Sequence, residues 1–115
     1  MQDCIFCKLA NHEIPTEVVY EDERFFAFKD ANPQAPVHVL VVPKEHYASV
    51  ADDVPADVLG GVLETAVKVA RISGLGDRGF RLIMNTGADA GQTVMHLHCH
   101  VLGGTDMGEG MLPNA

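Results

Sequence analysis

Histidine alternates with apolar residues in the stretch Met95-His96-Leu97-His98-Cys99-His100-Val101-Leu102. Successive side chains of a β-strand point to opposite faces, so a strand here would place the three histidines in one row on an open face. With a rise of ~3.3 Å per residue, neighbouring imidazoles would sit roughly 6–7 Å apart. The apolar residues of the stretch would form the buried face: Met95, Leu97, Cys99 and Val101.

Apolar patterns upstream of this stretch predict the rest of a sheet. Strands are expected at residues 17–20, 24–29, 37–42, 80–84 and 94–102. The first two flank the charged turn Glu21-Asp22-Glu23 and should form a hairpin. The last two are joined by a polar loop over residues 85–93.

The apolar period changes to that of a helix between residues 55 and 73. Asp52 or Asp53 is expected to cap the start of this helix. Two adjacent glycines, Gly60 and Gly61, weaken its middle by roughly 1 kcal/mol each relative to alanine. Close packing against the sheet would account for them.

A second, shorter helix or turn is expected at residues 4–10, with Ile5, Phe6 and Leu9 pointing inward. The predicted fold class is therefore α+β. It has a mainly antiparallel sheet of about five strands, one long helix and a short N-terminal helix. The length of 115 residues, of which 47% are hydrophobic, fits a single domain over residues 1–115 with a modest core.

Charge and composition restrict the partners. A net charge of −8 argues against nucleic acid as a partner, although backbone amides can still hold the phosphate of a small nucleotide. No apolar run approaches the ~20 residues of a membrane span, and the first residues lack the features of a signal peptide. A cytoplasmic protein that does not contact membranes is expected. Three cysteines, an odd number, argue against a disulfide framework.

The histidine row has three interpretations. It can be a solvated polar face, or it can supply His-x-His ligands to a metal. The third is nucleophilic catalysis, because a neutral imidazole can attack phosphorus while neighbouring histidines stabilise the phosphoryl charge. His98 is flanked on both sides and is best suited to attack.

A second motif, Cys4-x-x-Cys7, has the spacing that commonly supplies half of a tetrahedral zinc site. Two small buried cysteines at a helix start are the alternative. A redox pair is less favoured, because the strand–helix context of a thioredoxin is missing.

The run from Gly91 to Gly104 (GQTVMHLHCHVLGG) resembles the signature of the histidine triad hydrolases and transferases. Its Gly-Gly ending is similar to that of the purine nucleoside phosphoramidase branch rather than the dinucleoside polyphosphate hydrolases. Further stretches resemble that branch along nearly the whole chain: residues 4–8, 14–15, 26–30, 33–36, 38–44 and 80–85.

The resemblance implies roles for individual residues. His98 would be the nucleophile, with His96 and His100 orienting it and binding phosphate oxygens, and His38 lying beside them. Thr93, where the family often has serine, would contact the phosphate or the departing amine. The implied nucleotide-binding residues are Ile5, Phe6, Phe28, Asp30, Ala31, Leu40, Asn85, Gly91, Gln92, Thr93, Val94, His98 and His100. Among these, Asp30 would bind the ribose hydroxyls.

The chain resembles zinc-bearing members of the family. By that resemblance, His46 and His96 would complete a structural zinc site with Cys4 and Cys7. The implied activity needs no cofactor: hydrolysis of purine nucleoside 5′-phosphoramidates or related adenylates through a nucleotidyl-histidine. The implied assembly is a homodimer whose sheet continues across both copies. The alternatives are dinucleoside polyphosphate hydrolysis, zinc-dependent hydrolysis, and a non-catalytic nucleotide-binding interaction module.

Overall fold

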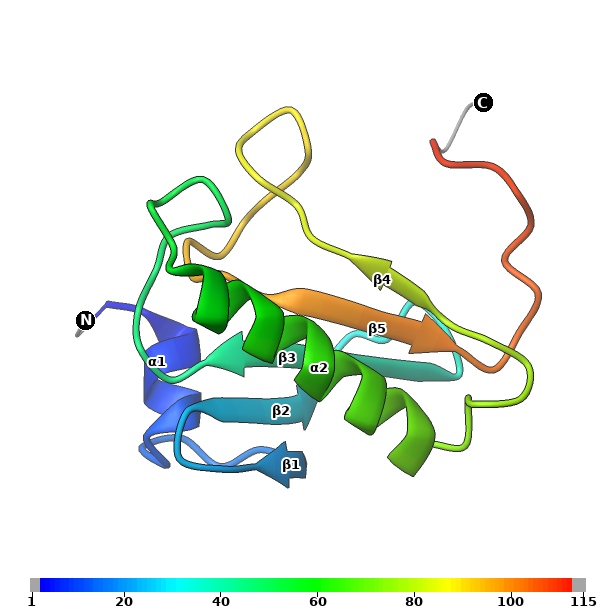
Figure 1. The fold of residues 1–115 in the computed structure, drawn as a ribbon, viewed down its shortest axis with the longest axis horizontal. Helices are drawn as coiled ribbons and strands as arrows, with labels where there is room; N and C mark the ends of the chain where they lie inside the picture. The colour runs from blue at the N-terminus through cyan, green and yellow to red at the C-terminus, as the bar shows by residue number, and fades with distance from the viewer. Residues whose placement is uncertain (1–2, 113–115) are drawn as a thin grey trace.

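The computed structural model describes residues 3–112, which form a five-stranded sheet with a helix on each face (Figure 1). The strands are β1 (Val18–Glu21), β2 (Phe25–Lys29), β3 (Val37–Pro43), β4 (Arg81–Ile83) and β5 (Cys99–Gly103). Their order in the sheet is β1-β2-β3-β5-β4, and all neighbours are antiparallel. The predicted α+β class is confirmed. Within the described range, no helix is long and apolar enough to cross a bilayer.

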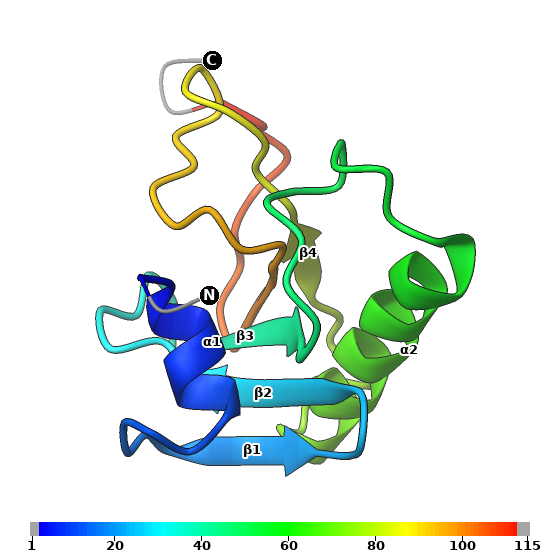
Figure 2. The same ribbon diagram turned by 90° about the vertical axis from the view of Figure 1, so that its left-hand side faces the viewer.

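The sheet separates two cores, one under each helix (Figure 2). The long helix α2 (Ala56–Ile72) packs on one face, against side chains such as Val39, Val41 and Val101. The short helix α1 (Ile5–Ala10) covers the other face, where Phe26, Phe28 and Leu40 are buried. Since residues alternate along a strand, β2 and β3 contribute to both cores.

Gly61 has a packing reason that Gly60 lacks. A Cβ added at Gly61 would lie 2.1 Å from the Phe25 ring, whereas one added at Gly60 would meet nothing within 4 Å. The close packing expected for the glycine pair therefore holds for one of its two members.

The predicted cap of the long helix is wrong. Pro55 is the N-cap residue of α2, and no side chain caps it. The carboxylate of Asp52 instead accepts a hydrogen bond from the Ala48 amide at 2.8 Å, and Asp53 adopts a left-handed φ of 47°. A capping side chain must belong to the residue directly before the first helical turn, and the helix starts too late for either aspartate.

The strand predicted at residues 94–102 is shorter than expected, because β5 begins at Cys99. Cys99 lies opposite Val41 on β3, a register that would set Pro43 opposite Leu97. Proline has no N–H to donate and ends the ladder there. Residues 94–98 therefore run outside the sheet, and Met95, predicted to be buried, is 51% exposed.

Two smaller predictions also need correction. β4 spans Arg81–Ile83 rather than residues 80–84. Ile5, predicted to point inward, is 49% exposed, because it lies on the side of α1 that faces away from the sheet core, whereas Phe6 and Leu9 are buried as expected.

Candidate functional site

The three histidines of the row lie on the α1 face, but they are held differently. His100 is part of β5, opposite Leu40 of β3. His96 and His98 precede the strand, and His96 is fully buried. The ring of Phe6 covers His98 edge-on, with ring centroids 5.0 Å apart. The prediction of an open histidine face is wrong for this reason: α1 covers part of the row.

The hydrogen bonds of His98 define its tautomer. Its Nδ1 lies 2.6 Å from the main-chain carbonyl oxygen of His96. A carbonyl can only accept, so Nδ1–H donates, and a neutral His98 carries its lone pair on Nε2. This is the form of imidazole that attacks an electrophilic phosphorus.

A second hydrogen-bond chain gives His100 the opposite tautomer. The Gln34 amide donates to Nδ1 of His38 at 3.0 Å, so the proton of a neutral His38 is on Nε2. That Nε2 lies 2.8 Å from Nδ1 of His100, which therefore accepts. A neutral His100 then carries its proton on Nε2 and is a donor for a phosphate oxygen. The site thus offers a nucleophilic nitrogen on His98 and a donor on the adjacent imidazole.

Burial keeps these donor histidines neutral. It lowers the pKa of His100 to about 4, and the neighbouring His98 and His38 act in the same direction. Burial also lowers the pKa of His38, against an opposing effect of the Asp30 carboxylate. At neutral pH both rings therefore carry a single proton, as the tautomer assignment requires.

Asp30 borders the His38–His100 pair. One carboxylate oxygen lies 3.4 Å from Nε2 of His38. The other accepts a hydrogen bond from the Asn32 amide at 2.8 Å and so closes the turn that follows β2. Asp30 is partly exposed, which leaves its carboxylate accessible to a hydroxyl-bearing ligand.

Apolar residues expected around a purine divide into two groups. Phe6, Phe28 and Leu40 are buried together under α1, and the two phenylalanine rings meet edge-to-face at 5.4 Å. Ile5 and Ala31 are exposed instead. The structure thus places the first three in a core that borders His98, with the other two at its surface.

The loop before the histidines is braced by Gln92. Its side-chain amide donates to the carbonyl oxygens of Ala48 at 2.7 Å and Val94 at 3.1 Å, and its Oε1 accepts from the Gly87 amide. Gly91 adopts a φ of 79°, a conformation that favours glycine. Thr93 is exposed at the end of the loop.

A cavity of about 400 Å³ opens beside this loop and the start of α1. Its lining includes Ile5, His46, Thr93 and Val94. Asn85, half-buried, lies two residues after the end of β4, at the other end of the loop.

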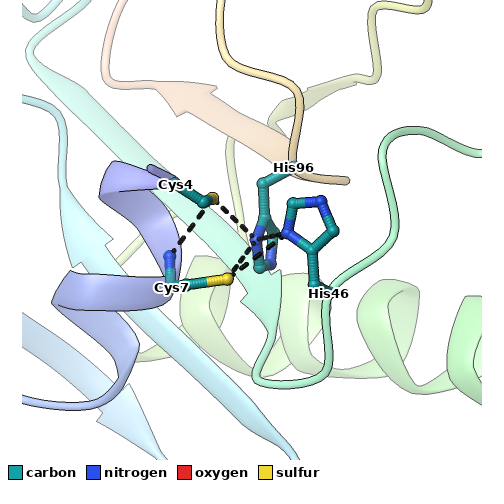
Figure 3. A group of neighbouring side chains, drawn as sticks. All are labelled: Cys4, Cys7, His46 and His96. Carbon is teal, nitrogen blue, oxygen red and sulfur yellow. Dashed lines mark hydrogen bonds between the residues drawn. The ribbon is translucent and has the colours of Figure 1, made fainter. Parts of the chain in front are cut away.

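The structure brings Cys4, Cys7, His46 and His96 together (Figure 3). Nδ1 of His96 lies 3.3 Å from Sγ of Cys4, 3.4 Å from Sγ of Cys7 and 3.1 Å from Nδ1 of His46. Sγ of Cys7 lies 3.3 Å from Nδ1 of His46. We call these four residues the Cys/His cluster. Their ligand atoms all lie within 4.8 Å of one another.

The Cys/His cluster fits a tetrahedral metal. Zinc–ligand bonds of about 2.0–2.3 Å separate the ligand atoms of a tetrahedron by about 3.3–3.8 Å, close to the contacts found here. Hydrogen bonds explain these contacts less well, because Nδ1 of His96 has one lone pair for three neighbours. Nε2 of His96 donates to the carbonyl of Pro43 at 2.8 Å, which leaves Nδ1 free to face the cluster.

Sequence reasoning missed the residues that orient the histidines through the main chain. These are Gln34 through its amide, and Pro43 and Tyr47 through their carbonyls. Any residue can supply a main-chain group, so no residue type signals this role. The proline at the end of β3 was the available clue, because it marks where the ladder stops.

This chain is similar to a family model, to known sequences and to solved structures, and these similarities agree with one another. The family model described as the HIT domain matches residues 11–107. Purine nucleoside phosphoramidase from Escherichia coli is 42% identical over 110 residues, covering 93% of this chain and 92% of that protein. Protein HitA from Neisseria gonorrhoeae is 47% identical over 105 residues, covering 90% and 97%. A HIT family hydrolase from Clostridium thermocellum superposes with a TM-score of 0.93 at 50% identity, covering 97% of this chain and 99% of that one.

Proposed function

The chain belongs to the HIT domain family, and on that basis we propose that it hydrolyses purine nucleoside 5′-phosphoramidates or related adenylates to nucleoside monophosphates. One observation carries the proposal. The hydrogen bond from His98 to the His96 carbonyl leaves a lone pair on Nε2 of His98, next to the donor His100. The similarity to the phosphoramidase of Escherichia coli supports this substrate class.

In the proposed reaction, Nε2 of His98 attacks the α-phosphorus and the P–N bond to the amine breaks. The departing amine takes up a proton from solvent, and a nucleotidyl-histidine forms. Water then attacks phosphorus and releases a proton to solvent, the bond to Nε2 breaks, and the monophosphate is released. Nε2–H of His100 donates to a phosphate oxygen and stabilises its developing charge. No step needs a cofactor.

The proposed binding roles are those that the family resemblance implies, and the chemistry of each side chain suits its role. The Asp30 carboxylate accepts hydrogen bonds from the ribose hydroxyls, and Phe6 and Leu40 contact the purine. Thr93 supplies a hydroxyl at the phosphate or the departing amine. Asn85 and the loop residues Gly91, Gln92 and Val94 border the phosphate, while Ile5, Phe28 and Ala31 complete the base site.

We propose that the Cys/His cluster holds a structural zinc ion. Four protein ligands leave no open position for a catalytic water, so the ion would stabilise the fold rather than hydrolyse the substrate. Activity of the loaded protein should therefore not depend on added metal. Complete loss of turnover with a chelator, while the protein stays folded and the His98 tautomer is unchanged, would instead indicate zinc-dependent hydrolysis.

We also propose a single domain over residues 1–115 that assembles as a homodimer. An outer strand such as β4 has main-chain groups that can pair with a second copy and continue the sheet. Sedimentation equilibrium tests this: a dimer mass is expected, and a monomer across the accessible concentrations contradicts it. The cytoplasmic location stays a prediction.

The function is tested by comparing two substrates, adenosine 5′-phosphoramidate and diadenosine tetraphosphate, with and without a chelator. We expect release of adenosine monophosphate from the phosphoramidate with the higher kcat/KM. Preference for the tetraphosphate would favour the polyphosphate hydrolase alternative. Nucleotide binding without turnover of either substrate would favour the interaction module.

A further inference from the structure

The segment that carries the proposed nucleophile is fastened to the chain after β3 rather than to the sheet. β5 begins at Cys99, so residues 96–98 lie outside the ladder. The Leu97 amide instead donates to the Tyr47 carbonyl at 2.6 Å. The His96 ring donates from Nε2 to the Pro43 carbonyl at 2.8 Å. Residues 43–47 thus clamp this segment at two points.

The Cys/His cluster adds a third point of attachment to the same segment. His46 belongs to residues 43–47, and its Nδ1 lies 3.1 Å from Nδ1 of His96. Cys4 and Cys7 approach the same nitrogen from the start of α1 (Figure 3). Two distant parts of the chain therefore meet at the His96 ring.

The main-chain carbonyl of His96 connects this attachment to His98. It accepts the hydrogen bond from Nδ1–H of His98 at 2.6 Å. A shift of residue 96 would move this acceptor, and His98 would lose the partner that keeps its proton on Nδ1. His100 has no such dependence, because its partner is His38 and its main chain is in the β3–β5 ladder.

We propose that the Cys/His cluster, when it holds a divalent metal, positions His98 for attack by fixing the His96 carbonyl. This inference rests on the proposed function, and it assigns the cluster an effect on the rate of the chemical step besides any effect on folding. His46 is then a positioning residue that acts through His96. Loss of the cluster should disturb His98 and leave His100 unchanged.

The test compares wild type with His46→Ala and with His12→Ala as the matched control. His12 is an exposed histidine whose Nε2 contacts Glu21 at 2.8 Å, away from the cluster. Co²⁺ uptake is followed by its tetrahedral absorption spectrum, and imidazole ¹⁵N spectra report the tautomers of His98 and His100. Single-turnover cleavage of adenosine 5′-phosphoramidate and the Kd of adenosine monophosphate are measured on the same samples.

For His46→Ala we expect loss of tetrahedral Co²⁺ binding and a single-turnover rate lower by about 10- to 100-fold. The Kd of adenosine monophosphate should stay within about threefold. His98 should show a mixture of tautomers, while His100 keeps its wild-type spectrum. His12→Ala should match wild type in every measurement.

Three results would overturn the inference: wild type that takes up no Co²⁺, a metal-free His98 with an unchanged tautomer, or His98 and His100 changing together. If His46→Ala does not fold, removal and re-addition of metal to wild type gives the same comparison. If no variant cleaves the phosphoramidate, the proposed function fails, and the Co²⁺ and ¹⁵N spectra still decide whether the cluster positions His98.

Discussion

The two faces of the sheet use the same strands for different purposes. On the α2 face, β3 and β5 present Val39, Val41 and Val101 to an apolar core. On the α1 face, the alternate positions of the same strands carry His38 and His100. One step along a strand thus separates a residue that stabilises the fold from one that is available for chemistry.

The polar face is compatible with burial because its groups are paired. Among the described residues, no buried side-chain nitrogen or oxygen lacks a hydrogen-bond partner. An unpaired buried polar group costs about 1–3 kcal/mol, so the histidines are held in their tautomers by the cost of leaving a partner unpaired. We therefore predict that substitutions of His98 and His100 on the α1 face affect the reaction more than stability, and that substitutions of buried apolar residues on the α2 face do the reverse.

His98→Ala is expected to have the largest effect. Loss of the nucleophile should lower the single-turnover rate for adenosine 5′-phosphoramidate by about 10⁴-fold or more. Stability should fall by about 1–3 kcal/mol, because the buried carbonyl of His96 loses its hydrogen-bond partner. Rapid-quench kinetics and urea unfolding measure the two quantities. Equal rates for His98→Ala and wild type would refute the covalent mechanism.

His100→Ala and Val101→Ala form an adjacent pair on opposite faces. Removing the His100 donor should lower kcat by about 10²–10³-fold. Val101 is fully buried under α2, and its truncation should cost about 2 kcal/mol of stability while the folded protein keeps near-normal kcat. Steady-state kinetics and urea unfolding of both variants test the pair. If both variants mainly lower kcat, or both mainly lower the free energy of unfolding, the division between the faces is wrong.

Gly61→Ala and Gly60→Ala test packing on the α2 face. The new methyl of Gly61→Ala would clash with the Phe25 ring, so we expect a loss of about 1–3 kcal/mol. Gly60→Ala has open space and should gain up to about 1 kcal/mol from helix propensity. Thermal unfolding of both variants shows whether the signs differ. A gain of stability in both variants would mean that the Phe25 ring moves aside to accommodate the new methyl group.

The pH dependence of stability tests the α1 face. The pKa of His100 is about 4 in the folded protein, against 6.5 for a free histidine, so the unfolded chain binds more protons between these values. The free energy of unfolding should be greatest above pH 6.5 and should fall as the pH drops toward 4. A contribution on the order of 1–2 kcal/mol is expected from this ring, allowing for its partial exposure. Urea unfolding at several pH values in this range measures it. The free energy of unfolding should change less steeply with pH for His100→Asn than for wild type.

The alternation of apolar residues in the sequence predicted much of the fold, because every second residue of a strand faces the same side of the sheet. Leu97, Cys99 and Val101 do face the α2 core. Where the ladder begins depends on the partner strand, since Pro43 ends β3. Met95 therefore emerged on the surface, although the pattern within its own strand predicted burial.

The sequence indicated which side chains make up the candidate site. It did not indicate the main-chain hydrogen bonds and packing that orient them. Cys4-x-x-Cys7 indicated half of a metal site, and the resemblance supplied His46 and His96. The tautomer of His38 depends on the Gln34 amide, whose position follows from the loop conformation and not from residue type. The partial cover of His98 by Phe6 depends on where α1 docks.

The most direct test of the account is to trap the intermediate. Wild type mixed with adenosine 5′-phosphoramidate would be quenched within the first turnover, digested and sequenced by mass spectrometry. We expect a nucleotidyl group on the peptide that carries His98, attached to that residue and absent from His98→Ala. Release of adenosine monophosphate at the normal rate with no adduct, or with the adduct on another residue, would contradict it.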